Sequence, residues 1–331
     1  MKQYLRVLVI TASVLSALIL TIGVAIAAKP ADGKGSGQHD EIVNYWTPDR
    51  AAKAKPREVS PQGKPGTAVE PERKPGGGST SGGSTGASWN SGGLVKKTVG
   101  KVLFTMGGAD YVCSATVVQD ARPTESMVLT AGHCVYDSVD GWATNWMFMP
   151  DFDSAPSQYS GGSFNCAVLP YGCWTADSLV TSTGWSAGNF NEDYGFAVIS
   201  MFGHLDLLEN VVGAQAISFT GVRPSTAYAF GYPQASPYNG SDLVYCSGST
   251  VADTWGGSTD SGLKCNMTGG SSGGGWFSPF TTGTGTGTLV SVNSFKYTAG
   301  PYKGYMFGPR FDGDTQSTYN AAQIALVNTI N

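Results

Sequence analysis

The stretch Leu129-Thr130-Ala131-Gly132-His133-Cys134-Val135 decides the fold of this chain. A β-type run ends here in small residues that present a histidine flanked by a cysteine. The chain has only three histidines, and the other two have ordinary interpretations. His39 lies in a polar N-terminal stretch, and His204 stands among apolar residues, as a structural histidine does. His133 is therefore the candidate general base.

An acid precedes a predicted buried strand in Asn191-Glu192-Asp193-Tyr194-Gly195-Phe196-Ala197-Val198-Ile199. A carboxylate at the mouth of that strand can be buried against an imidazole and hold its orientation. We prefer Asp193 to Glu192 because it immediately precedes the buried run. Taken alone, either acid would be interpreted as a solvated turn residue. The position of the stretch between the histidine and a serine-containing turn favours Asp193 as the orienting acid.

A serine lies in the glycine-rich stretch Met267-Thr268-Gly269-Gly270-Ser271-Ser272-Gly273-Gly274-Gly275-Trp276. Acyl transfer by serine requires an imidazole base, an acid that orients it, and NH donors for the developing oxyanion. A glycine-rich turn lets the backbone approach a substrate closely. Similar runs occur between Gly76 and Ser84, but this one follows Cys265 in the folded part of the chain. Ser272 is therefore the candidate nucleophile.

The order of these residues along the chain separates two fold classes. Gly270-Ser271-Ser272-Gly273-Gly274 also matches the G-x-S-x-G elbow of α/β-hydrolases. In that class the histidine follows the serine, whereas all three histidines of this chain precede Ser272. The order His133, Asp193, Ser272 is that of the chymotrypsin arrangement.

The composition predicts an all-β domain. Forty-six of the 331 residues are glycine. From Leu94 onward, short apolar runs such as Val102-Leu103-Phe104 alternate with turn-rich stretches. This region of roughly 240 residues is large enough for one substantial core or for two barrels. Residues 316–328 carry apolar positions three and four apart, which predicts a short C-terminal helix.

Charge and motifs exclude several partners. Charged residues make up 13% of the chain, and the formal net charge is −4. The charges form no basic stripe, so we expect no nucleic-acid partner. The sequence contains no HExxH, no EF-hand-like pattern of Asp and Gly, and no strand-linked phosphate loop. We therefore expect no metal and no organic cofactor.

All six cysteines lie in the predicted folded part, and no pair of CxxC motifs is present. This pattern disfavours zinc and favours three disulfides. Six cysteines allow 15 pairings, but their order suggests that neighbours along the chain are joined. The suggested pairs are Cys113 with Cys134, Cys166 with Cys173, and Cys246 with Cys265.

The N-terminus carries an export signal. Lys2 and Arg6 precede an apolar run from Val7 to Ala28 that closes with Ala25-Ile26-Ala27, the small-x-small pattern of a signal-peptidase site. We expect a signal peptide over residues 1–27, secretion from the cell, and no stable membrane association after cleavage. The run is long for a signal peptide, so an uncleaved anchor is the alternative.

Residues 28–93 are rich in Pro, Gly, Ser and Lys and have almost no apolar periodicity. Such a stretch buries too little surface to offset the entropy lost on ordering. The prediction is either a disordered linker or a pro-segment removed on maturation, as in a zymogen.

Thr130-Ala131-Gly132-His133-Cys134 resembles the histidine motif of chymotrypsin-like serine peptidases, and Cys113 resembles the half-cystine that bridges to the cysteine beside that histidine. With the acid and serine stretches, the resemblance spans about residues 99–311. Gly231-Tyr232-Pro233 and the stretch 268–273 resemble the bacterial glutamyl endopeptidase-like branch of this family. The resemblance implies that residues 94–331 form two packed six-stranded antiparallel β-barrels, with His133, Asp193 and Ser272 in the cleft between them.

The resemblance also implies further site residues. By carry-over, the oxyanion hole consists of the backbone NH groups of Gly270 and Ser272. In trypsin-type members the residue before the nucleophile is an aspartate that pairs with a freed N-terminal ammonium, but here it is Ser271. A hydroxyl cannot form that ion pair, so we predict that activation does not work by inserting a freed N-terminus against this residue.

The predicted substrate pocket consists of Asn266, Met267 and Asn293. The base of the pocket is expected near Asn266 and Met267, where the sequence has no acid that would bind Arg or Lys. Glutamate preference in the named branch is associated with a histidine at the position of Asn293. We therefore expect an uncharged or weakly polar preference rather than strict glutamate specificity.

The function implied is that of a secreted, monomeric serine endopeptidase that hydrolyses polypeptides through an acyl-enzyme. Two alternatives use the same scaffold. One is a secreted binding protein that has lost catalysis, against which the intact His133, Asp193 and Ser272 argue. The other is an esterase or amidase, because acyl transfer does not itself choose the leaving group.

Overall fold

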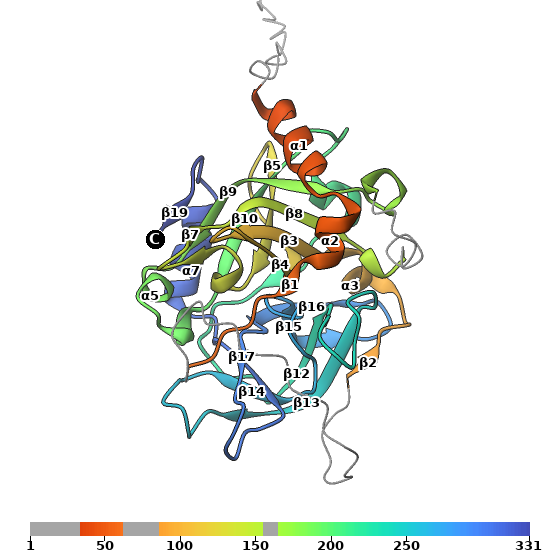
Figure 1. Cartoon of the computed structure of the whole chain (residues 1–331). Coiled ribbons are helices and arrows are strands. Elements are labelled where there is room, and N and C mark those ends of the chain that lie inside the picture. Colours follow the sequence, from red (N-terminus) through yellow and green to blue (C-terminus); the bar gives the residue numbers. More distant parts are fainter. Residues whose placement is uncertain (1–33, 62–85, 155–164) are drawn as a thin grey trace, which may run out of the picture. The chain divides into compact units, whose positions relative to one another are not determined.

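The computed structural model describes residues 34–61, 86–154 and 165–331 (Figure 1). The chain divides into two units, and nearly all of the described residues belong to the second, Gly35–Asn331. The predicted signal peptide and the glycine-serine runs near residue 80 lie outside the described residues. No helix of the described part is both long and apolar enough to cross a bilayer.

Six strands of the N-terminal half close into an antiparallel barrel in the order β4-β3-β8-β9-β10-β5, and β5 pairs back onto β4. Alternate side chains of these strands point inward and fill the barrel, and closure leaves no exposed edge among them. This half confirms the predicted six-stranded barrel. The strands are β3 (Val99–Met106), β4 (Ala109–Val118), β5 (Glu125–Thr130), β8 (Thr144–Pro150), β9 (Trp174–Thr181) and β10 (Gly195–Ser200).

The C-terminal half is a second, mostly antiparallel sheet in the order β11-β16-β15-β12-β13-β14-β18-β17, with β2 paired to β13. Figure 1 draws it below the first barrel. The chain is thus mostly β, as predicted. The strands are β2 (Ala87–Ser88), β11 (Ala216–Ile217), β12 (Thr226–Gly231), β13 (Val244–Ala252), β14 (Ser261–Lys264), β15 (Gly275–Thr281), β16 (Thr286–Val292), β17 (Phe295–Lys296) and β18 (Tyr305–Gly308).

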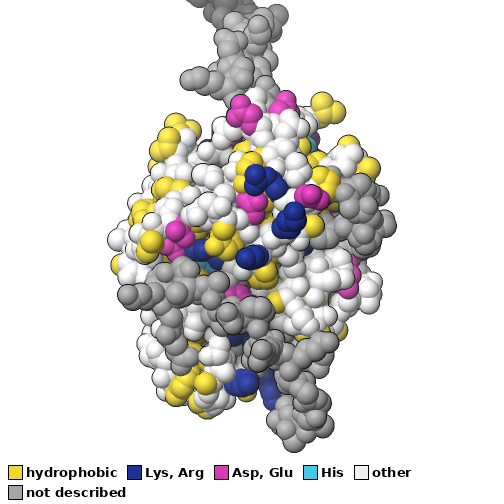
Figure 2. All heavy atoms as spheres, viewed as in Figure 1, with side chains coloured by type: hydrophobic (Ala, Val, Ile, Leu, Met, Phe, Trp, Pro, Cys, Tyr) yellow, Lys and Arg dark blue, Asp and Glu magenta, His cyan; other side chains and the backbone are white. Residues whose placement is uncertain are grey.

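Helices in the described part are few and short. The remaining strands make short pairings: β6 with its neighbour β7, and, between distant parts of the chain, β1 with β4 and β19 with β9. On the face shown in Figure 2, basic and acidic side chains are interspersed rather than sorted by sign. These elements are α1 (Lys34–Tyr45), α2 (Pro48–Lys53), α3 (Gly93–Thr98), α5 (Thr183–Ser186), α6 (Leu208–Val212), α7 (Gly313–Ala322), the 3-10 turns η1 (Gly132–Cys134), η2 (Phe152–Ser154), η3 (Cys166–Val168) and η4 (Phe190–Glu192), and the strands β1 (Lys55–Pro56), β6 (Tyr136–Asp137), β7 (Gly141–Trp142) and β19 (Thr329–Ile330).

The C-terminal helix is present but displaced from its predicted span of 316–328. Helix α7 begins earlier because Asp312 caps it: its carboxylate accepts from the NH of Thr315, whose hydroxyl accepts from the NH of Asp312. The helix ends at Ala322, and the chain then turns so that β19 pairs with β9. Ile324 and Leu326, predicted to be helical and packed, are 80% and 82% exposed.

Residues 34–61 and 86–93 of the N-terminal stretch carry regular structure, unlike a disordered linker, while residues 28–33 and 62–85 lie outside the described residues. Residues 34–61 form α1, α2 and β1, and β2 and the start of α3 fall at the other end of the stretch. The reason is tertiary packing: Ile42, Trp46, Ala51 and Ala54 are buried in the same apolar core as the first barrel. Four widely spaced apolar residues give little periodicity in the sequence. They are nevertheless enough to stabilise these helices when they pack into a large core.

Three disulfides are formed, and they join Cys113 to Cys134, Cys166 to Cys173, and Cys246 to Cys265. These are the neighbouring pairs that the order of the cysteines suggested. The first disulfide ties β4 to the turn that carries His133.

Candidate active site

His133 lies in η1, directly after β5, and its side chain is fully buried. Its Nδ1 is 2.8 Å from Asp193 Oδ2, and its backbone NH donates to Asp193 Oδ1 at 2.8 Å. The register of β10 against β5, with Gly195 opposite Thr130, brings the two residues together. With Nδ1 donating to the carboxylate, Nε2 carries the lone pair that a general base needs.

Asp193 is fully buried and accepts a third hydrogen bond, from the hydroxyl of Ser294. A buried carboxylate is tolerated only when its oxygens are well supplied with donors. Both oxygens of Asp193 are supplied, so the acid is held in one orientation toward the imidazole. The sequence argument did not identify Ser294, because nothing in the chain near residue 294 indicates a partner 101 residues away.

Ser272 lies in a tight turn between β14 and β15. Gly270 and Gly273 adopt φ angles of +99° and +81°, which a side chain rarely permits. A Cβ on Gly273 would also lie 2.4 Å from the backbone oxygen of Ser114. Among the described residues, the NH groups of Gly270 and Ser272 donate to no acceptor within the fold. The turn therefore presents a hydroxyl and two unused NH donors at one place.

Ser114 on β4 fixes this turn against the first barrel. Its hydroxyl donates to the oxygen of Gly270 at 2.9 Å and accepts from the NH of Tyr232 at 2.9 Å. Its backbone NH donates to the oxygen of Ser272 at 2.7 Å. Ser114 follows Cys113 in the sequence, and no local pattern there indicates that it holds the turn that carries Ser272.

The link between serine and histidine is not formed in this structure. His133 Nε2 is buried and has no hydrogen-bond partner among the described residues. The Ser272 hydroxyl instead donates to the backbone oxygen of Arg57 at 3.3 Å. The three predicted catalytic residues are thus gathered in one place, with the serine turned to a residue of the N-terminal stretch.

The predicted pocket residues have different surroundings. Asn293 is fully buried: its Nδ2 donates to the oxygens of Phe230 and Ser271, and its Oδ1 accepts from Trp276 Nε1. All these bonds lie inside the fold. The Asn293 side chain therefore stabilises the turn that carries Ser271 and Ser272. Ser271 is also buried, and its hydroxyl donates to the oxygen of Thr268.

Asn266 and Met267 lie where β14 leads into the nucleophile turn. Asn266 Oδ1 accepts from the Tyr238 hydroxyl at 2.7 Å and from the NH of Gly86 at 2.6 Å. Met267 is buried, and its oxygen accepts from Lys296 Nζ at 3.1 Å. From the sequence we expected no acid near this position, and nothing there indicated the lysine from residue 296.

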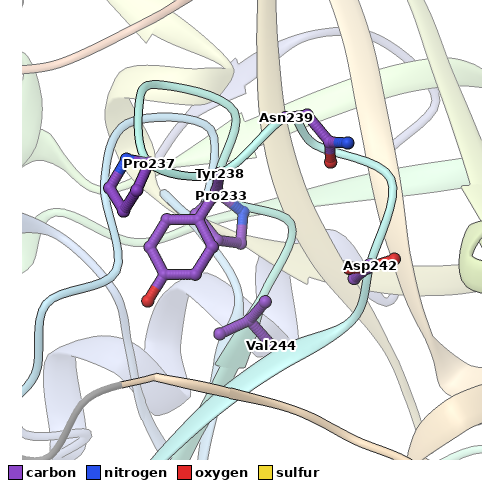
Figure 3. Close-up of a pocket in the computed structure, with 6 residues that line it drawn as sticks. All are labelled: Pro233, Pro237, Tyr238, Asn239, Asp242 and Val244. Atoms are coloured by element: carbon purple, nitrogen blue, oxygen red, sulfur yellow. The ribbon is translucent and has the colours of Figure 1, made fainter.

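A pocket of 160 Å³, shown in Figure 3, is lined in part by Tyr238, whose hydroxyl bonds Asn266. The ring of Tyr238 stands next to Val244 in this pocket, and none of the lining residues belongs to the predicted triad. The pocket is lined by Pro233, Pro237, Tyr238, Asn239, Asp242 and Val244.

The other two histidines lie away from the triad and contact each other. The His39 ring meets the His204 ring edge to face at 5.6 Å, and His204 stacks on Trp174 at 3.4 Å. Burial lowers the pKa of His39 and also the pKa of His204 below the ordinary value of 6.5. Burial of both rings thus favours their neutral forms.

One cluster of possible metal ligands, formed by Cys113, His133 and Cys134, occurs among the described residues. Both sulfurs belong to one disulfide, so neither is a thiolate that could bind zinc.

No protein-family model and no curated protein sequence matches this chain. Solved structures do match it. The protease Anisep from Arthrobacter nicotinovorans is 38% identical, with 69% of this chain and 96% of that protein covered and a TM-score of 0.58. The thermostable serine protease AL20 from an extremophilic microorganism is 37% identical, with 70% and 98% covered and a TM-score of 0.58. A Glu endopeptidase shares the fold at 17% identity, with 70% and 92% covered and a TM-score of 0.51.

Identities of 38% and 37% over nearly the whole length of two proteases exceed what a shared fold alone requires. The closed first barrel, the mostly antiparallel second sheet and the short C-terminal helix agree with this relationship. The chain belongs to the chymotrypsin-like serine proteases and is a serine-type endopeptidase.

Proposed function

We propose that this protein is a secreted endopeptidase, made as a zymogen, in which Ser272, His133 and Asp193 hydrolyse peptide bonds through an acyl-enzyme. The observation that carries the proposal is the buried contact of 2.8 Å between His133 Nδ1 and Asp193 Oδ2 beside the nucleophile turn. When Nδ1 donates to a buried carboxylate, Nε2 is left as the proton acceptor that a general base needs. A histidine with a purely structural role does not require a buried carboxylate at Nδ1.

In the proposed reaction, Ser272 Oγ attacks the carbonyl carbon of the substrate while His133 Nε2 takes the hydroxyl proton. The oxyanion is stabilised by the NH groups of Gly270 and Ser272, and each such donor contributes on the order of 10²- to 10³-fold in rate. His133 then protonates the leaving amine, and water attacks the acyl-enzyme by the same route. Asp193 remains ionised and stabilises the imidazolium.

A fluorophosphonate probe tests the assignment. The processed protein should be labelled, and Ser272→Ala should not be. Ser271→Ala is the matched control, because it removes a neighbouring hydroxyl that is bonded to Thr268 rather than aimed at a substrate. Labelling of processed Ser272→Ala, or absence of labelling of the processed wild type, would contradict the proposal. Hydrolysis of a peptide library by the same samples separates a peptidase from an esterase.

A further inference from the structure

Residues 54–60, called segment 54–60 below, connect the N-terminal helices to the catalytic residues. After α2, the chain enters β1, which pairs in parallel with β4 so that Lys55 lies opposite Tyr111. The NH of Arg57 then donates to the oxygen of Val112 at 3.4 Å. Figure 1 shows β1 between the strands of the N-terminal half and those of the C-terminal half. The segment thus pairs with the part of β4 at Tyr111 and Val112, close to Ser114 on the same strand.

Arg57 contacts two of the three proposed catalytic residues. Its backbone oxygen accepts the hydrogen bond from Ser272 Oγ at 3.3 Å, and its Nε donates to the backbone oxygen of His133 at 2.9 Å. The serine hydroxyl cannot give this proton to Arg57 and to the imidazole at the same time. Segment 54–60 therefore competes directly with the base for the nucleophile.

The Arg57 side chain is anchored by a buried ion pair. Its Nη2 lies 2.6 Å from Asp137 Oδ2, and the two side chains are only 4% and 1% exposed. The guanidinium also lies 5.1 Å from the centre of the Tyr111 ring. A planar cation with a carboxylate partner, a carbonyl acceptor and an aromatic face is held in one position.

The flanks of the segment bind the domain on both sides of Arg57. Before it, the oxygen of Ala54 accepts from Gln234 Nε2 at 2.8 Å. After it, Val59 is 6% exposed and belongs to an apolar cluster with Trp185 and Phe295. Between these contacts, the Glu58 side chain lies against Gly269, close enough that a Cβ there would overlap it.

The peptide at Arg57 is bound in a way that does not lead to reaction. Attack requires the carbonyl carbon about 3–3.5 Å from the nucleophile with its oxygen at the oxyanion donors. Here the oxygen itself faces Ser272 Oγ as a hydrogen-bond acceptor, and it receives no bond from the NH groups of Gly270 and Ser272. The contact satisfies the hydroxyl and leaves the oxyanion donors unused, so the segment is held without being cleaved.

We propose that segment 54–60 is a built-in inhibitor that holds Ser272 Oγ on a backbone carbonyl and is anchored by Arg57 in the Asp137 site. This inference rests on the proposed roles of Ser272 and His133. It also distinguishes between the two interpretations of the N-terminal stretch: residues 34–61 act as a pro-segment, and activation must release Arg57 from Asp137.

The test compares the rate of fluorophosphonate labelling in full-length chains, with the uncut band separated from any processed product. The first comparison uses a chain with a site-specific protease sequence inserted between residues 61 and 86, before and after cutting and dilution. Cutting converts an intramolecular contact into a bimolecular one, which dilution dissociates. We expect the cut and diluted chain to be labelled on the order of 100-fold faster than the uncut chain, or more. This is the range expected because dissociation of the segment also removes the buried ion pair between Arg57 and Asp137.

The second comparison keeps the chain uncut. Arg57→Ala should label at least about tenfold faster than wild type, because the anchor is lost. Lys55→Ala is the matched control: it removes a neighbouring but exposed cation and should leave the rate unchanged. Arg57→Ala combined with Val59→Asp, which also breaks the apolar contact, should approach the rate of the cut chain.

The outcomes separate the two proposals. If the uncut wild type is labelled as fast as the cut chain, or if Arg57→Ala and Lys55→Ala behave alike, the inhibitor is refuted and the peptidase assignment stands. If no form is labelled, including the cut chain and the double variant, the proposed catalytic function itself fails.

Discussion

Replacing Asp137 with asparagine separates the inhibitory contact from catalysis. In the uncut chain, Asp137→Asn leaves the buried guanidinium of Arg57 without its carboxylate. Removing one partner of a buried ion pair costs about 3–5 kcal/mol. The lower value applies here, because Arg57 keeps the His133 oxygen at 2.9 Å and the Tyr111 ring at 5.1 Å. At about 1.4 kcal/mol per factor of ten, binding of the segment should weaken on the order of 100-fold.

The amide keeps the local turn intact. Asp137 Oδ1 accepts from the NH groups of Val139 and Asp140 at 2.7 and 3.1 Å, and an asparagine oxygen can make both bonds. Asp137→Asn should therefore raise the labelling rate of the uncut chain strongly and leave that of the processed enzyme nearly unchanged.

A double-mutant cycle on uncut chains measures the coupling. We would measure labelling rates of wild type, Asp137→Asn, Arg57→Ala and the double variant, with thermal unfolding as a check on folding. Because both single changes remove the same pair, the double variant should gain little over either one. Additive effects, or an uncut Asp137→Asn within twofold of wild type, would refute the argument that this pair anchors the segment.

Three further outcomes follow from the site and its surroundings. Ser294→Ala removes a donor to the buried carboxylate of Asp193, and kcat of the processed enzyme should fall by about 10- to 100-fold with KM little changed; an unchanged kcat would contradict the orienting role of this bond. Ser271→Ala should retain most activity and should be activated by the same cut as wild type, whereas near-complete loss would restore an essential role for this position. Burial lowers the pKa of His39, which lies in α1, and of His204. The chain therefore binds fewer protons when α1 is packed on the barrel than when α1 is detached from it. The packing of α1 should have its full stability above pH 6.5 and lose stability as the pH falls below it. Hydrogen exchange of α1 at pH 7.5 and 5.5 measures this, and His39→Gln should largely abolish the difference.

The three proposed catalytic residues could be selected from the sequence because their signals are local. His133 follows a β-type run and is one of only three histidines, and Ser272 lies in a folded glycine-rich turn. The order of these residues along the chain selected the two-barrel fold. The first barrel was predictable for a related reason: its strands are apolar runs separated by turns, and that pattern is a property of each segment alone.

The contacts that tune the site could not be predicted from local pattern. Ser294 reaches Asp193 across 101 residues, and Arg57 reaches Ser272 across 215. Arg57 in particular lies in a polar stretch where an arginine is normally solvated. Its role depends on a single carboxylate, Asp137, 80 residues away. Only the folded chain brings such residues together.

Ser114 has a consequence for how this protein gains and loses activity. Its hydroxyl and NH connect the first barrel to Gly270, Tyr232 and Ser272. These contacts close long loops, so we expect them to form late in folding, when both halves are already in place. The enzyme should therefore become able to react only at the last step of its maturation. Conversely, a substitution that opens a cavity in the core of the first barrel would shift Ser114 and inactivate Ser272 without contacting it. Damage to the first barrel should therefore abolish activity even when the second half of the chain is intact.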